Sequence, residues 1–356
     1  MPHLFEPLRV RGVELANRIF VSPMCQYSCD NGMATEWHLV HLGSRAVGRA
    51  AAVIAEATAV TADARISPRD LGIWSDAHIA PLKRALAFIE QQGSVPGIQL
   101  AHAGRKASTR EPWKGGTPIS PAEGGWTPIY APSPIPFAEG YQTPQALKKE
   151  QIAVIVTAFV QAAQRALEAG AKLLEIHSAH GYLLHSFLSP LSNQRTDEYG
   201  GTFENRIRML CEVVTVVRKV WPEGYPLSVR VSCTDWAEGG WTIEETVHLA
   251  KVLRELGTDF LDCSSGGTLP KAKIPVGPGY QAPFAERVRR EAGISTIAVG
   301  MITDPAQADT IIRSGQADAV MLAREFLRQP YWPLLAAREL GHDIQWPVQY
   351  DRAKLK

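Results

Sequence analysis

The feature that most constrains the fold is a repeated alternation of short apolar runs with segments of helical periodicity. The runs are apolar at nearly every position, which is typical of parallel strands covered on both faces. They predict eight strands, at residues 18–24, 51–59, 95–101, 172–177, 227–232, 260–264, 296–300 and 319–324. The pattern therefore indicates an α/β protein.

Between these runs, apolar residues recur every three or four positions, as on one face of a helix. Thr242 and Glu245 form a capping-box pattern, and Asp304 precedes Pro305 as an expected N-cap. The expected helices cover residues 78–92, 151–169, 203–220, 243–256, 283–292, 305–314 and 324–340.

Strands and helices in this alternation predict a (β/α)8 or TIM barrel. A doubly wound open sheet is the main alternative, but it calls for a glycine-rich turn after its first strand. Residues 22–27, which follow the first expected strand, contain no glycine. We therefore expect one barrel domain over residues 1–356.

Charge and cysteine content exclude several classes of protein. Lys and Arg total 37 and Asp and Glu total 36, so the net charge of +1 gives no basic footprint for nucleic acid. No run approaches the ~20 apolar residues of a membrane helix, and the start of the chain lacks a signal-peptide pattern. The five scattered cysteines predict no disulfide framework and favour a cytoplasmic location.

Residues 111–144 interrupt the alternation after the third expected strand. This segment holds eight of the 25 prolines, five glycines and several aromatic residues, and it shows no strand or helix pattern. Long loops of this kind on a barrel are expected to be lids or interface arms. A plain surface loop is the alternative.

Polar residues gather at the carboxyl ends of the expected strands, where a barrel places its active site. Gly300 and Arg324 end the last two strands, a position where barrels commonly bind phosphate. Arg230 lies inside an otherwise apolar strand, so it must be paired or face a ligand. A flavin pyrimidine edge would suit it, and the Gln99 amide could bind the same edge.

The sharpest local pattern is His177-x-x-His180. In one interpretation the two imidazoles bind zinc with a carboxylate such as Glu175, which makes a metal-dependent TIM-barrel hydrolase or aldolase the alternative function. In the other, they donate hydrogen bonds to a substrate oxygen while Tyr182 stands by as proton donor. A role in capping the strand is a third, non-catalytic interpretation.

Taken together, the motifs resemble the Old Yellow Enzyme family of FMN-dependent ene-reductases. The resemblance is strongest to the thermophilic-like class that includes the xenobiotic reductases, and it spans nearly the whole chain. The matching segments are residues 17–27, 70–76, 99–106, 177–182, 187–193, 195–201, 205–206, 300–304 and 347–352.

The resemblance implies an NADPH dehydrogenase with ene-reductase activity. NADPH or NADH would reduce non-covalently bound FMN, which would then reduce the C=C bond of an enone or enal. The family's breadth extends to nitro compounds and nitrate esters. By the same resemblance, His177 and His180 bind the substrate carbonyl, Tyr182 delivers the proton and Cys25 tunes the flavin.

The other roles also follow from the resemblance. The flavin would be bound by Ser22, Pro23, Met24, Cys25, Ala57, Gln99, Arg230, Gly300, Met301, Ala323 and Arg324. Substrate contacts would come from Tyr27, Lys106 and Arg352, with no metal. Arg352 lies in the C-terminal tail, residues 342–356, and would enter the site of a neighbouring subunit in a homodimer or homotetramer. The family usually has glycine where this chain has Ala323, so phosphate binding is expected provided that no positive φ is needed there.

Overall fold

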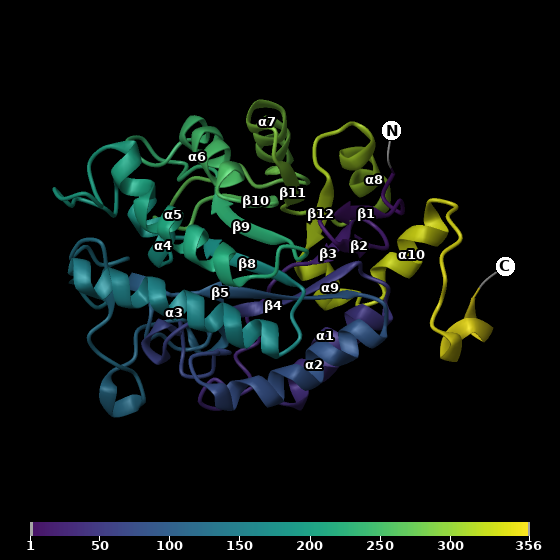
Figure 1. Cartoon of the computed structure of the whole chain (residues 1–356), viewed down its shortest axis with the longest axis horizontal. Coiled ribbons are helices and arrows are strands. Elements are labelled where there is room, and N and C mark those ends of the chain that lie inside the picture. Colours follow the sequence, from purple (N-terminus) through teal and green to yellow (C-terminus); the bar gives the residue numbers. More distant parts are fainter. Residues whose placement is uncertain (1–2, 355–356) are drawn as a thin grey trace.

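The computed structural model describes residues 3–354, in which eight parallel strands close into a barrel (Figure 1). The barrel prediction is confirmed, because β12 pairs with β3 and completes the ring. The barrel strands are β3 (Ile19–Val21), β4 (Ala52–Ala59), β5 (Val95–Ala101), β8 (Leu173–Ser178), β9 (Leu227–Ser232), β10 (Phe260–Ser264), β11 (Ser295–Val299) and β12 (Ala319–Leu322).

Helices cover the outside of the barrel, and their apolar faces pack against the strands. They are α1 (Glu36–Val47), α2 (Ile79–Gln91), α3 (Lys149–Glu168), α4 (Leu183–Leu188), α5 (Phe203–Val220), α6 (Ile243–Glu255), α7 (Ala282–Ala292), α8 (Pro305–Arg313), α9 (Arg324–Arg328) and α10 (Trp332–Glu339). Both expected N-caps are confirmed. Thr242 accepts a hydrogen bond from the Glu245 amide, and Asp304 accepts one from the Gln307 amide.

Two predictions about local structure were wrong. The single helix expected over residues 324–340 is broken into α9 and α10, because Pro330 lacks an N–H and disfavours helical backbone at Gln329 before it. Residues 111–144 do contain regular structure, since β6 (Tyr130–Ala131) pairs with β7 (Gln145–Ala146). A two-residue strand is too short to show any periodicity in the sequence.

Apolar side chains fill the amino-terminal end of the barrel. Phe20 and Phe260 meet edge to face there, with ring centroids 6.0 Å apart and neither side chain exposed. Around them lie Ile54, Leu173, Ile297 and Met321, and we call these six residues the amino-end cluster. The hairpin of β1 (Leu8–Val10) and β2 (Val13–Leu15) packs across this cluster and closes the end.

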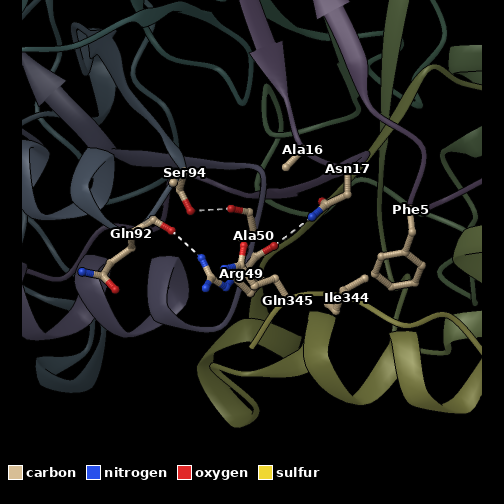
Figure 2. Close-up of a pocket in the computed structure, with 10 residues that line it drawn as sticks. Phe5, Ala16, Asn17, Arg49, Ala50, Gln92, Ser94, Ile344 and Gln345 are labelled. Carbon is tan, nitrogen blue, oxygen red and sulfur yellow. Dashed lines mark hydrogen bonds between the residues drawn. The ribbon is translucent and has the colours of Figure 1, made fainter. Parts of the chain in front are cut away.

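The C-terminal tail also lies at the amino-terminal end. Ile344 and Gln345 line a cavity of about 240 Å³ with Asn17, Arg49 and Ser94, which come from the segments leading into β3, β4 and β5 (Figure 2). Beyond the cavity, a short 3-10 turn over Val348–Ala353 stands away from the barrel, and Val348 is 76% exposed. Residues 1–2 of the expected domain and residues 355–356 of the expected tail lie outside the described residues. None of the helices in residues 3–354 has the length and apolarity needed to cross a membrane.

Candidate active site

Residues 177–182 are the last two residues of β8 and the turn that follows it, and they bring the three expected substrate residues together. The His177 ring lies 5.2 Å from that of His180 and 5.1 Å from that of Tyr182, both nearly perpendicular. His180 has a φ of +60°, and its Nε2 lies 2.7 Å from the Ser264 hydroxyl. The backbone of the turn thus presents all three side chains to one space.

The protonation states in this turn follow from burial. Burial, together with the nearby Arg230 charge, lowers the pKa of both His177 and His180 well below the usual value, so both rings are neutral at physiological pH. Burial raises the pKa of Tyr182 above its usual value, so its hydroxyl keeps its proton. A neutral imidazole can donate one N–H, and His177 Nδ1 is buried with no hydrogen-bond partner among residues 3–354.

Arg230 lies in the barrel interior next to this turn. Its Nη1 donates to the Ser22 hydroxyl at 3.0 Å, and its Nε lies 3.1 Å from a carboxylate oxygen of Asp262. Gln99 donates to Glu175 at 2.8 Å. Both side chains expected at a flavin pyrimidine edge therefore contact a buried carboxylic acid, Asp262 for Arg230 and Glu175 for Gln99. Sequence reasoning missed Asp262, which lies within an apolar run, and weighed Glu175 only as a metal ligand.

A cavity of about 280 Å³ lies between the ends of β11 and β12. It is lined by Arg230, Gly300, Met301, Ala323 and Arg324, which are five of the residues expected to hold the flavin. Gly300 has a φ of +119°, a conformation that L-residues rarely adopt. Ala323 has a φ of −111°, so this position does not need the positive φ for which the family's usual glycine would be required.

The segment after β3 carries Ser22 to Tyr27, and it begins at the hydroxyl that accepts the hydrogen bond from Arg230. Glu56 accepts a hydrogen bond from the Gln26 amide at 2.8 Å and faces His38 Nε2 at 3.1 Å, and both side chains are buried. Burial and the Glu56 carboxylate raise the pKa of the half-buried Cys25, which is therefore a thiol. Tyr27 has a φ of +49° and packs edge to face on Trp113, at 5.6 Å.

Of the remaining predicted flavin contacts, Pro23 and Met24 lie in that same segment and are half-buried. Ala57, on β4, lines a small space of about 10 Å³ together with Tyr182 and Asp70. Ala57 therefore borders the turn that carries Tyr182.

The other two expected substrate contacts lie differently. The Lys106 ammonium donates to the carbonyl oxygens of His180 at 2.7 Å and Gly267 at 2.6 Å, and it lies 4.1 Å from the centre of the Phe137 ring. Burial, with Arg105 beside it, lowers the pKa of Lys106 to about 7. Arg352 is exposed in the C-terminal turn, away from the residues that gather at the strands' carboxyl ends.

Residues 3–342 match the model of the NADH:flavin oxidoreductase / NADH oxidase family. The chain belongs to this family. It is 51% identical over 351 residues to an NADPH dehydrogenase of Geobacillus sp. (strain WCH70), a match that covers 98% of both chains. It is 49% identical over 354 residues to an NADPH dehydrogenase of Halalkalibacterium halodurans, which covers 99% of both.

Solved structures of the flavin oxidoreductase family show the same architecture. Morphinone reductase superposes with a TM-score of 0.79 at 29% identity, over 97% of this chain and 91% of that chain. The Old Yellow Enzyme homologue from Zymomonas mobilis gives a TM-score of 0.78 at 25% identity, over 98% and 95%. The resemblance to the Old Yellow Enzyme family is thus confirmed, and the protein is an FMN- and NAD(P)H-dependent oxidoreductase.

The residues present fit FMN. The cavity beside Arg230 combines three arginines, Arg230, Arg324 and Arg328, with the backbone of Gly300, where a Cβ would come within 2.7 Å of the Gln281 amide, and this arrangement suits a phosphate. The alternative of a metal-dependent hydrolase is not supported. In residues 3–354 no group of three His, Cys, Asp or Glu side chains could hold a metal, and Glu175 is bonded to Gln99 and Ser228 instead.

Proposed function

We propose that this flavin oxidoreductase is an ene-reductase that reduces the activated C=C bond of α,β-unsaturated carbonyl compounds with electrons from NAD(P)H. The observation that carries the proposal is the turn of residues 177–182, which presents two neutral imidazoles and a protonated phenol to one space. The relationship to morphinone reductase, whose name denotes a ketone substrate, supports a carbonyl-bearing substrate.

Each side chain of the turn has a defined part in this proposal. His177 and His180 donate hydrogen bonds to the substrate's carbonyl oxygen and stabilise the negative charge that develops on it. When bound, FMN supplies the hydride that it has taken from NAD(P)H. The Tyr182 hydroxyl, whose proton is retained because its pKa is raised, protonates the α-carbon. A nitro compound or a nitrate ester offers the same donors an oxygen to bind, so the proposal includes these classes.

Tyr182→Phe tests the proton donor by anaerobic stopped flow. NADPH reduction of the flavin should stay within about threefold of wild type, while reoxidation by 2-cyclohexenone should slow by about 10² to 10⁴, the range of general acid catalysis. Tyr199→Phe is the matched control, because Tyr199 hydrogen-bonds Glu212 on the outside of the barrel. An unchanged reoxidation rate in Tyr182→Phe would contradict the role of Tyr182. A wild-type flavin that NADPH cannot bleach would contradict the activity itself.

We also propose that the protein is a homodimer or homotetramer in which Arg352 completes a neighbour's site. Three observations support this. Residues 344–345 lie at the amino-terminal end of the barrel, the tail beyond them stands away from it, and Tyr350 is 41% exposed. In Arg352→Ala, sedimentation velocity should report the wild-type assembly while KM for 2-cyclohexenone rises about tenfold. A monomeric wild type with normal turnover would exclude a shared site.

Residues 111–144 fit a lid in this scheme, because Trp113 contacts Tyr27 and Phe137 contacts Lys106. The five cysteines are all unpaired, which supports a reducing compartment such as the cytoplasm.

A further inference from the structure

A buried His–Asp pair lies directly behind the turn of residues 177–182. His185 is on α4 and Asp235 follows β9, and neither side chain has any exposed surface. His185 Nε2 faces Asp235 Oδ1 at 3.3 Å, and neither atom has another partner among residues 3–354. Neither residue is among those that line the cavity between the ends of β11 and β12.

The aspartate is ionised and fixed in place. Burial alone would raise the pKa of Asp235, but the facing His185 ring and the hydrogen bond from the Ser189 hydroxyl hold it well below its usual value. Its second oxygen, Oδ2, accepts from the Ser189 hydroxyl at 2.5 Å and from the Trp241 amide at 2.8 Å. Only Oδ1 is therefore left for His185.

The hydrogen bonds of His185 decide which ring nitrogen carries its proton. Nδ1 accepts the backbone N–H of Gly181 at 2.8 Å, so Nδ1 must be unprotonated. The ring proton then lies on Nε2, which points at the Asp235 carboxylate. A carboxylate that fixes the tautomer of a histidine in this way also fixes which atom the other nitrogen can bind.

The hydrogen bond from the Gly181 N–H to His185 is important because the backbone at this position has an unusual conformation. His180 and Gly181 both have left-handed conformations, with φ of +60° and +73°, and His180 is a non-glycine residue, for which this conformation is strained. The surroundings must hold such a turn. The His180 amide donates to Ser232 at 2.9 Å, its carbonyl accepts from Lys106, and the Gly181 amide is held by His185.

We propose that Asp235, acting through His185, is a positioning residue that holds the turn so that His180 and Tyr182 meet the substrate together. This inference rests on the proposed ene-reductase function. Asp235 fixes the His185 tautomer, His185 fixes the peptide between His180 and Gly181, and the side chains on both sides of that peptide are thereby aimed into the site.

Asp235→Asn tests the relay with almost no change of shape. If the new amide NH2 faces His185, the ring proton must move to Nδ1. Two donors, Nδ1–H and the Gly181 N–H, then face each other, and the hydrogen bond between them is lost. If the amide is turned over, its NH2 opposes the Trp241 N–H instead. We expect reoxidation of the reduced flavin by 2-cyclohexenone to slow at least 30-fold, with FMN affinity unchanged. Ser192→Ala is the control, because Ser192 is buried nearby and bonds only the carbonyls of Ser186 and Ser189. It should stay within threefold of wild type.

His185→Asn separates a relay from a general loss of packing. The asparagine oxygen can accept the Gly181 N–H from about the position of Nδ1, with no need of a carboxylate. Asp235→Asn should therefore cost at least 30-fold in the wild-type background and less than threefold in the His185→Asn background. Equal losses in both backgrounds would overturn the proposal.

A readout that does not depend on turnover is the ¹⁵N NMR spectrum of the histidine rings, with His185 assigned by its absence from His185→Asn. The wild type should show His185 protonated at Nε2 alone, and Asp235→Asn should change that state. A wild-type ring protonated at Nδ1 would overturn the inference. Failure of the wild type to reduce 2-cyclohexenone would refute the proposed function and leave the tautomer result to be judged separately.

Discussion

The amino-terminal end of the barrel is closed and apolar, whereas the carboxyl end is polar and carries the site. The same strands build both. Along β10 the inward residues are Phe260 in the amino-end cluster, then Asp262 beside Arg230, then Ser264 at His180. Along β8 they are Leu173, Glu175 and His177. From its amino end to its carboxyl end, each of these two strands therefore points three kinds of side chain inward. The first packs in the amino-end cluster, the second is a buried acid, and the third lies at the substrate site.

This gradient implies that stability and chemistry can be changed separately. A substitution in the amino-end cluster should alter the free energy of unfolding and leave turnover alone. A substitution of a buried acid, Glu175 or Asp262, should alter how the free energy of unfolding depends on pH. The three predictions below test that separation, beginning with the largest effect.

Phe260→Ala should lower the free energy of unfolding by about 3–5 kcal/mol, because it empties a fully buried aromatic site against Phe20. Urea unfolding followed by circular dichroism measures the loss, and the milder Phe260→Leu serves as the volume control at about 1 kcal/mol. Turnover per folded, flavin-loaded molecule should match wild type. A parallel loss of turnover would show that the two ends are not independent.

Glu175→Gln should remove a pH dependence of stability. Burial, with Asp262 beside it, raises the pKa of Glu175 to about 8. A raised carboxyl pKa stabilises the folded state only while the group is protonated, so that contribution is lost as pH rises from about 5 through about 8. The amide can keep the bonds to Gln99 and Ser228.

We therefore expect Glu175→Gln to be more stable than wild type at pH 9 by up to about 5 kcal/mol, with the difference shrinking towards pH 5. Urea unfolding at a series of pH values gives the two curves, and Glu90→Gln, at a largely exposed carboxylate, is the control. Parallel curves for Glu175→Gln and wild type would mean that Glu175 is ionised in the folded protein.

Asp259→Asn should have the smallest effect, a loss of about 1 kcal/mol of stability. Asp259 lies at the amino end of β10, where it accepts two bonds from Arg11 Nε, at 2.7 and 2.8 Å, and one from the Leu227 amide. Thermal unfolding measures the loss. A change in KM for 2-cyclohexenone would contradict the view that polar groups at this end only anchor strands.

The sequence predicted the barrel and the residues around its mouth because these depend on local patterns. Apolar runs mark strands, and motifs such as residues 177–182 are contiguous. The helix α1 escaped prediction in part because Gly43 lies inside it, yet a Cβ there would come within 2.8 Å of the Phe88 ring. Close packing of α1 on α2, which no local pattern records, explains that glycine.

The supports of the site could not be predicted for a related reason. His185 and Asp235 are 50 positions apart, and the pairing of β8 with β9 brings together the segments that follow these two strands. Asp262 lies in an apolar run of the sequence, and its burial is explained only by its ion pair with Arg230 on the neighbouring strand. Partners of this kind are set by strand register and not by spacing along the chain.

The β1–β2 hairpin has a kinetic consequence. Within residues 3–354, the hairpin and the amino-end cluster fill one end of the barrel, so anything bound at the carboxyl end enters and leaves from that end. An electron donor and an electron acceptor that use the same entrance cannot bind at the same time, so one must leave before the other enters. Initial rates measured against each should then give parallel double-reciprocal lines, and an excess of either should slow the other.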